Sequence, residues 1–112
     1  MSDIQELIDL LVKFRDDRDW GQFHDSKNLA LALSTEAAEL NELFLWKKDS
    51  ESKNIDRERL KEELADVFAY ALMLAERNNL SVSDIVKQKI QKNAEKYPVE
   101  ECRGSSAKYK ET

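Results

Sequence analysis

Two pairs of acidic residues interrupt helical segments that are otherwise largely apolar. Glu36 and Glu39 belong to one such segment, and Glu63 and Asp66 belong to another. A spacing of three residues places both carboxylates of a pair on one face of a helix, about one turn apart. Because their neighbours are mostly Leu, Ala, Val and Phe, we expect part of that face to be buried, and a buried carboxylate needs a compensating partner. If both faces meet, two helices would bring four carboxylates together, and divalent cations are their natural compensation.

Two explanations of the acidic pairs stay open from the residues alone. Hard divalent cations bind oxygen ligands, and Mg²⁺ is the usual one in such a setting. Glu-x-x-Glu pairs are also common in solvated helices, and 37% of this chain is charged. Either pair alone is more often a surface pair, whereas two pairs in apolar helical segments make the two explanations about equally strong.

Composition predicts a single all-α domain. The chain has 112 residues with only two Gly and one Pro, so it has little turn chemistry and is expected to form few, long elements. The abundant Leu, Ala, Glu and Lys favour helix. A formal net charge of −5 speaks against binding a nucleic acid polymer or an anionic membrane surface.

Several features predict a cytoplasmic protein without a membrane span. The single cysteine, Cys102, excludes an internal disulfide framework and suits a reducing compartment. The acidic N-terminal residues lack the features of a signal peptide. The longest apolar run, residues 67–75, is too short to cross a bilayer.

Helical periodicity and capping signals divide the chain into four expected helices. They cover residues from Ser2 to about Asp19, from Ser26 to Trp46, from Asp56 to Asn78 or Asn79, and from Ser81 to the residue before Pro98. Short connections between them favour an antiparallel four-helix bundle. The domain is therefore expected to span residues 1–98, with a polar C-terminal tail over 99–112.

The third expected helix predicts self-association. Residues 67–75 are apolar around the whole helix circumference, whereas a helix in an isolated bundle needs only one apolar stripe. Covering the second side requires another subunit, so we expect a homodimer or homotetramer.

Four rings are candidates for binding a flat ligand. Trp20 and His24 lie in the connection before the second helix, and connections often carry binding groups. Trp46 and Tyr70 extend the faces of the two acidic pairs, which suits a nucleotide whose phosphates bind Mg²⁺ and whose base stacks on a ring. Ordinary packing is the alternative for Trp46 and Tyr70, and a structural hydrogen bond is the alternative for His24.

Lys89 and Asn93 are weaker candidates for phosphate contacts. They lie four residues apart on the fourth expected helix, with Lys96 three residues further. A solvated basic face is the commoner explanation of such spacing.

Taken together, these motifs closely resemble the MazG-like all-α nucleoside triphosphate pyrophosphohydrolases, and their order is most similar to the dCTP pyrophosphatase branch. The resemblance extends from the first helix to the C-terminal tail, and the linked set is specific although each motif alone is not. It rests on Trp20, Phe23, His24, Asn28, Leu29, Glu36, Glu39, Leu40, Glu42, Leu43, Phe44, Trp46, Lys47, Glu62, Glu63, Leu64, Asp66, Val67, Tyr70, Lys89, Asn93, Tyr97, Pro98, Ser105, Ser106, Lys108 and Tyr109.

The resemblance implies roles for the candidate residues. The implied magnesium ligands are Glu36, Glu39, Glu63 and Asp66, and the implied nucleotide contacts are Trp20, His24, Trp46 and Tyr70. One departure is Leu11, where the branch can carry a histidine, and this puts the base preference in question.

The resulting hypothesis is an Mg²⁺-dependent enzyme that cleaves nucleoside triphosphates, with dCTP-like pyrimidines favoured, to monophosphate and pyrophosphate. Its role would be to clear unwanted nucleotides. Glu36 or Glu39 would orient or deprotonate the attacking water. The alternatives are a dUTPase-type enzyme of the same superfamily and a non-catalytic helical oligomerisation module.

Overall fold

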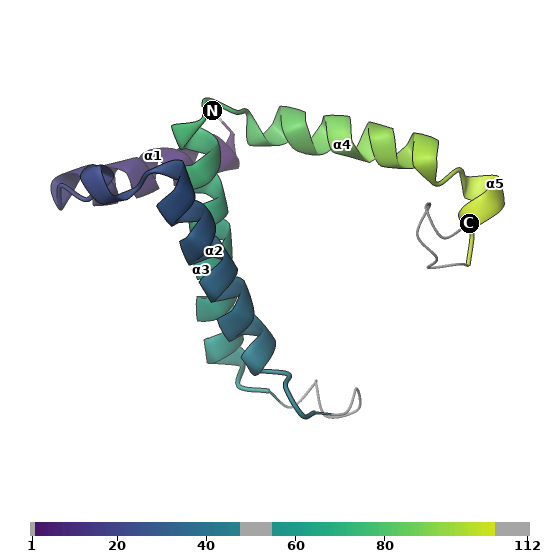
Figure 1. Ribbon diagram of the computed structural model, residues 1–112, viewed down its shortest axis with the longest axis horizontal. Coiled ribbons are helices and arrows are strands. Elements are labelled where there is room, and N and C mark those ends of the chain that lie inside the picture. The colour runs from purple at the N-terminus through teal and green to yellow at the C-terminus, as the bar shows by residue number, and fades with distance from the viewer. Residues whose placement is uncertain (1, 48–54, 105–112) are drawn as a thin grey trace. The chain divides into compact units, whose positions relative to one another are not determined.

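The computed structural model describes residues 2–47 and 55–104, which form helices joined by short connections (Figure 1). Within these ranges there is no β-strand, so the predicted all-α class is confirmed. The elements are α1 (Asp3–Asp17), the 3₁₀ helix η1 (Gly21–Phe23), α2 (Ser26–Glu42), α3 (Arg57–Arg77), α4 (Val82–Lys96) and α5 (Val99–Cys102). The chain divides into two compact units, Met1–Asn79 and Leu80–Thr112, and each is described by itself.

The helix starts are set by side-chain caps, and those of α1, α3 and α4 lie where the sequence predicts them, whereas the cap of α2 was not predicted. Each cap satisfies a backbone N–H that has no partner inside the helix, and such a cap contributes about 1 kcal/mol. At the start of α1, the Ser2 hydroxyl accepts the Gln5 N–H at 3.1 Å, while the Gln5 side-chain amide donates to Asp9 at 2.9 Å. The capping residues are Ser2 for α1, Asp25 for α2, Asp56 for α3 and Ser81 for α4.

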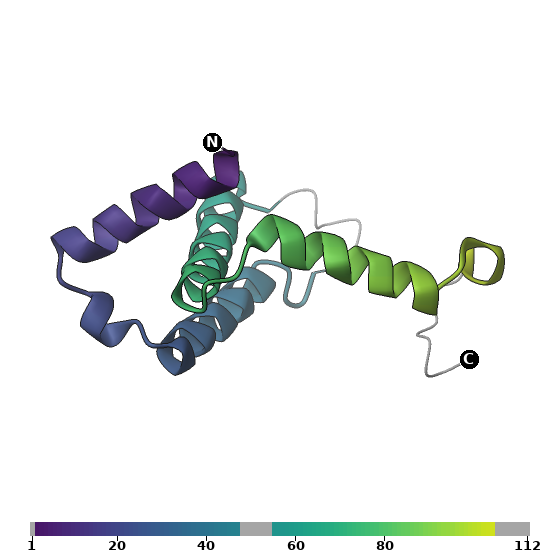
Figure 2. The same cartoon turned by 90° about the horizontal axis from the view of Figure 1, so that it is seen from above.

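In the first unit, α3 packs against both α1 and α2. The start of α2 lies beside the end of α3, where Asn78 Nδ2 donates to Ser26 Oγ at 3.0 Å, so the two helices run antiparallel. α1 lies across this pair near the same end, and Arg15 Nη1 donates there to Glu76 Oε2 at 3.1 Å (Figures 1 and 2). Side chains of α1 and of α2 can therefore both lie close to side chains of α3.

One side of α3 is buried and another side carries exposed apolar groups. Leu29 of α2 is 2% exposed, and truncating such a leucine to alanine costs about 2–5 kcal/mol of stability. On the other side, exposed Leu10 and Phe68 line an apolar groove of about 560 Å³ between α1 and α3. The buried apolar side chains of the first unit are Ile8, Leu29, Leu43, Leu72, Met73 and Ala75.

The predicted end of the second helix is wrong by four residues. α2 ends at Glu42, and the next N–H groups, starting with that of Leu43, bond to carbonyls three residues earlier. This change from the α-helical to the tighter 3₁₀ hydrogen-bond pattern ends the α-helix. Trp46 then adopts φ of 66°, a left-handed conformation that is rare for a bulky residue.

Other predicted boundaries fall close to the observed ones. α3 and α4 agree with expectation, and α1 ends two residues before Asp19. The residues expected as a plain tail begin with one helical turn, Val99–Cys102, in which Pro98 O accepts from the N–H groups of Glu101 and Cys102. The connection expected between the second and third helices lies mostly outside the described residues, at residues 48–54.

The antiparallel four-helix bundle stays a prediction, because α4 belongs to the second unit. Among the described helices, none is long and apolar enough to span a bilayer.

Candidate active site

Three of the four predicted metal ligands form a compact cluster between α2 and α3. Glu36, Glu39 and Glu63 each offer one carboxylate oxygen, and these oxygens all lie within 4.8 Å of one another. The i, i+3 spacing puts the two α2 residues on one face, and the antiparallel neighbour brings Glu63 to meet them. The three side chains are half-buried.

Among the described residues the cluster has no ion-pair partner, although the charge of Arg59 partly opposes the rise in the pKa of Glu63. Glu36 Oε2 and Glu63 Oε2 are buried without a hydrogen-bond partner among the described residues. Within residues 2–47 and 55–104, no Lys or Arg forms a salt bridge with any of the three carboxylates. Buried anionic oxygens without partners are costly, so this geometry suits a cation with oxygen ligands.

Mutual repulsion and burial favour protonation in this cluster. A hydrogen bond with the Glu36 carboxyl is the main cause that raises the pKa of Glu39 above its ordinary value, and the negative charge of Glu36 adds to it. The pKa of Glu63 is raised mainly by desolvation and then by its hydrogen bond with Glu39. Like charges held close together disfavour the ionised state in this way.

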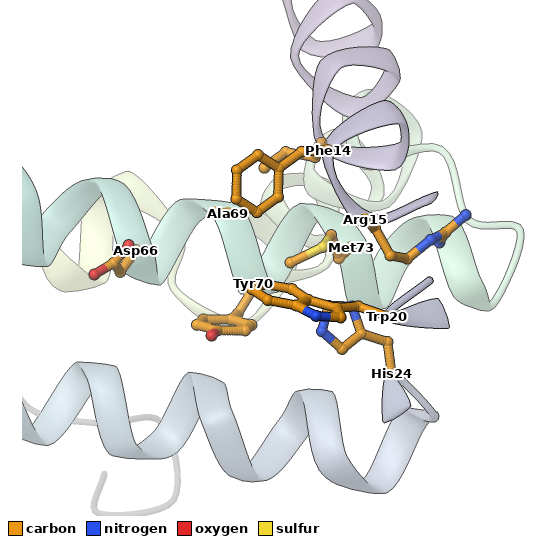
Figure 3. Close-up of a pocket in the computed structure, with 9 residues that line it drawn as sticks. Phe14, Arg15, Trp20, His24, Asp66, Ala69, Tyr70 and Met73 are labelled. Atoms are coloured by element: carbon orange, nitrogen blue, oxygen red, sulfur yellow. The ribbon is translucent and has the colours of Figure 1, made fainter. Parts of the chain in front are cut away.

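Asp66 lies outside the three-carboxylate cluster and joins it to a neighbouring pocket. It is exposed, and its charge contributes to raising the pKa of Glu63, one turn earlier on α3. Asp66 also lines a cavity of about 240 Å³ together with Trp20, His24 and Tyr70 (Figure 3). The acidic cluster and the pocket therefore adjoin at Asp66.

The rings of this pocket hold one another in edge-to-face contacts. Trp20 lies 5.7 Å from Phe14 at an interplanar angle of 73°, and 6.4 Å from His24 at 61°. The guanidinium of Arg18 lies 3.6 Å from the centre of the Phe14 ring. Such contacts restrain the indole while leaving part of it free, and Trp20 remains 43% exposed.

His24 and Tyr70 supply polar atoms to the pocket. His24 Nδ1 is buried and has no hydrogen-bond partner among the described residues. The pKa of Tyr70 is raised, first by desolvation and then by the charges of Glu36, Asp66 and Glu39. The Tyr70 hydroxyl therefore stays protonated and can donate a hydrogen bond.

The structure does not bring Trp46 to this pocket. Trp20 and His24 precede the first residue of α2, whereas Trp46 follows its last. Seventeen helical residues separate these points, a length of about 25 Å. The Trp46 side chain is 94% exposed, so it lies at the far end of α2 from the other rings.

Lys89 and Asn93 lie exposed on α4, in the second unit. Both are described within that unit alone.

Sequence reasoning assigned no site role to several residues of the pocket wall. Phe14 belongs to the apolar stripe of α1, which predicts core packing and gives no sign that the stripe ends at a ligand cavity. Leu11 belongs to the same stripe, and only the family resemblance linked it to base preference. No sequence motif indicated a site role for Arg15. The additional lining residues are Leu11, Phe14, Arg15, Ala69 and Met73.

Comparisons with known proteins agree with this arrangement. A family model described as MazG-like matches residues 31–112. dCTP pyrophosphatase 1 of Rattus norvegicus is 40% identical over 111 residues, which cover 95% of this chain and 65% of that protein. The Homo sapiens protein of the same name is 40% identical over 113 residues, covering 96% and 66%. The chain thus spans about two thirds of the length of the curated relatives it matches.

A solved structure also matches. The crystal structure of a pyrophosphatase from Archaeoglobus fulgidus superposes with a TM-score of 0.82 at 39% identity, covering 88% of this chain and 94% of that one. This similarity extends the sequence match to the all-α fold.

Proposed function

The chain belongs to the MazG-like family, and on that premise we propose that it is a nucleoside triphosphate pyrophosphohydrolase. It would cleave the bond between the α- and β-phosphates to give a nucleoside monophosphate and pyrophosphate. The names of the relatives, dCTP pyrophosphatase 1, support a dCTP-like pyrimidine deoxynucleotide as substrate. Such an activity would remove unwanted nucleotides from the cellular pool.

The observation that carries this proposal is the junction of an acidic cluster with an aromatic pocket. Glu36, Glu39 and Glu63 converge on one point, and Asp66 connects them to the cavity that Trp20 lines. A triphosphate with a flat base needs both parts side by side: oxygen ligands for a cation on the phosphates, and a ring surface for the base.

The donor set fits Mg²⁺. Carboxylate oxygens are its preferred protein ligands, and two buried oxygens of the cluster lack any partner among the described residues. Glu36, Glu39, Glu63 and Asp66 would hold it. A bound Mg²⁺ would offset the negative charge of the triphosphate and acidify the attacking water.

The side chains of the chain itself would orient the reactants. Glu36 or Glu39 would accept a hydrogen bond from the attacking water and take its proton. The Trp20 indole would stack on the base, and His24 and Tyr70 would offer it hydrogen-bonding groups. Lys89 and Asn93 would reach phosphate oxygens if α4 lies against the site.

Trp46 fits the proposal as a contribution from a second copy of the chain. A residue that is 94% exposed with φ of 66° is held in a conformation that costs about 1–3 kcal/mol, and such strain is concentrated at functional sites. The length of α2 separates Trp46 from Trp20 within one chain. A second copy could bring its own Trp46 to the base.

Self-association is supported by the apolar groove between α1 and α3. Phe68 is 59% exposed there, and large apolar patches of this kind mark protein interfaces. The protein would be a homodimer or homotetramer with helices packed as antiparallel four-helix bundles. We also propose a cytoplasmic location and a MazG-like domain over residues 1–98, followed by a tail over 99–112.

A single assay tests the activity. Pyrophosphate release is measured from dCTP, dUTP, dTTP, dATP and dGTP with Mg²⁺ and with EDTA. The proposal expects Mg²⁺-dependent release that is fastest from dCTP. Preference for dUTP would instead indicate a dUTPase-type enzyme, and no release from any nucleotide would leave a non-catalytic oligomerisation module.

A further inference from the structure

The connection that carries Trp20 and His24 is tied to the last turns of α3 at both ends. On the α1 side, Arg15 Nη1 donates to Glu76 Oε2 at 3.1 Å. The Arg15 side chain is only 16% exposed and that of Glu76 is 33% exposed, so solvent screens this pair less than a surface pair. On the α2 side, Asn78 Nδ2 donates to Ser26 Oγ at 3.0 Å.

Arg15 is in direct contact with the connection as well. Its carbonyl oxygen accepts the Trp20 N–H at 3.0 Å. A Cβ built on Gly21, the first residue of η1, would lie 3.6 Å from Arg15 Nε, which places the guanidinium against the η1 backbone. Asp16 Oδ1 accepts from the same Nε at 2.9 Å and fixes the orientation of the group. Movement of Arg15 would therefore be passed on to Trp20 and η1.

The other end of this ion pair lies on the same helix as the pocket wall. Tyr70, Met73 and Glu76 follow one another at intervals of three on α3, so they lie near one face. Tyr70 and Met73 line the pocket, whereas Glu76 does not belong to its lining. Figure 3 shows the Arg15 side chain pointing away from Tyr70. The pair therefore links the two walls at the edge of the pocket, where Arg15 belongs to the lining and Glu76 does not.

We propose that the Arg15–Glu76 ion pair is a positioning element that holds Trp20 and His24 opposite Tyr70 and thereby sets the affinity of the site for its base. This inference rests on the proposed function and adds residues to which that function assigns no role. A partly exposed ion pair contributes little to global stability. Its effect is expected in binding, because a preorganised ring avoids the entropy cost of ordering the connection.

The main test is Glu76→Gln, which removes the charge and keeps the shape. We expect KM for dCTP to rise about three- to tenfold, since part of the stacking on Trp20 is lost, with kcat within about twofold. The matched control is Asp17→Asn, which removes the exposed α1 ion pair between Lys13 and Asp17. It should leave KM and kcat unchanged, and an equal effect of both substitutions would overturn the proposal.

A spectroscopic measurement reports the position of Trp20 without relying on turnover. In a Trp46→Phe background, Trp20 is the one remaining tryptophan. Glu76→Gln should then increase acrylamide quenching of Trp20 and shift its emission to the red, and Asp17→Asn should not. Unchanged Trp20 fluorescence in a folded Glu76→Gln protein would contradict the positioning role.

Arg15 variants separate positioning from direct contact. Because the two residues act as one unit, Arg15→Met with Glu76→Gln should raise KM no more than the larger single change. An Arg15→Met effect with a silent Glu76→Gln would mean that Arg15 contacts the nucleotide itself, which overturns the proposal. If Glu76→Gln fails to fold, Arg15→Lys serves, because one ammonium cannot reproduce the fork that contacts both Asp16 and Glu76.

Failure of the proposed function would look different. A wild-type protein that releases pyrophosphate from no nucleotide would refute the activity, while the Trp20 fluorescence comparison would still decide the positioning role.

Discussion

A carboxylate oxygen of Glu36 on α2 lies within 4.8 Å of a carboxylate oxygen of Glu63 on α3, although the two residues are far apart in the sequence. Each of these side chains also has a buried oxygen without a hydrogen-bond partner among the described residues. The packing of α2 on α3 therefore forces like charges together. The apo protein is destabilised at this point, and ligand binding at the same point can recover the lost stability.

Replacing one carboxylate should affect turnover and stability in opposite directions. Glu39→Gln is expected to weaken Mg²⁺ binding and nearly abolish turnover, because a ligand is lost. It should raise the melting temperature of the apo protein, because repulsion within the cluster falls. Glu62→Gln, the same charge change at an exposed position of α3, is the control and should do neither. Full turnover of Glu39→Gln would refute the metal assignment.

The cluster should make apo stability fall as pH rises. A hydrogen bond with Glu36 holds the pKa of Glu39 above its ordinary value of 4.5, and desolvation raises the pKa of Glu63 above the same value. The folded state therefore binds more protons than the unfolded state. The resulting contribution to the free energy of unfolding is complete below pH 4.5 and is lost as pH rises through the raised pKa values of Glu39 and Glu63. Melting temperatures of wild type and Glu39→Gln across this range, measured in EDTA, should converge towards acid pH. A constant difference would contradict the assignment.

Removing the Trp20 ring should weaken nucleotide binding more than catalysis. Stacking on one ring contributes about 1–3 kcal/mol, so Trp20→Ala is expected to raise KM roughly five- to a hundredfold and reduce base discrimination. His24→Ala distinguishes two roles. Loss of base preference would indicate contact with the base, whereas an equal loss for all nucleotides would indicate support of the connection. Steady-state kinetics on the five deoxynucleotides provides the measurement.

The exposed side of α3 should mediate self-association. Phe68→Asp is expected to shift the protein towards monomer in sedimentation velocity at micromolar concentration while far-UV circular dichroism stays helical. Met73→Asp is a poorer probe, because Met73 is buried within the chain and its substitution should impair folding. A wild-type protein that sediments as a stable monomer would remove the basis for an interfacial site.

Mixing two variants that each bind nucleotide weakly should restore activity if Trp46 serves a partner's site. In a mixed dimer of Trp20→Ala and Trp46→Ala chains, one of the two sites keeps both wild-type rings. Co-refolded variants should therefore release pyrophosphate at a low nucleotide concentration where each variant alone does not. Activity equal to the average of the separate variants would place both rings in the same chain's site.

The sequence was sufficient to predict the all-α class, the family and the caps of α1, α3 and α4. Local signals carry these features: Ser2, Asp25 and Asp56 cap helices through residues two or three positions away. Asp25 had been placed in the connection without a capping role, so its signal was present and unused. The convergence of Glu36 and Glu39 with Glu63 was anticipated from their spacing in two helices, and the structure brings these three together.

What the sequence could not provide was the tertiary placement. Nothing near Trp46 predicts that α2 stops at Glu42, because the segment beyond it is apolar and favourable for helix. The link from Arg15 to Glu76 joins residues that are distant in the sequence, and neither belongs to a recognisable motif. Asp66 was expected among the ligands, yet its exposed position beside the pocket depends on the angle at which α3 meets its neighbours.

The regular spacing along α3 limits how this chain can be re-engineered. Glu63, Asp66, Tyr70, Met73 and Glu76 follow one another at steps of three or four residues on one uninterrupted helix. Inserting a single residue after Asp66 would turn everything beyond it by about 100° around the axis. Tyr70 would leave the pocket and Glu76 would leave Arg15, while Glu63 stayed in place. Length changes within α3 are therefore excluded, and chimaeras with related chains should be joined outside it.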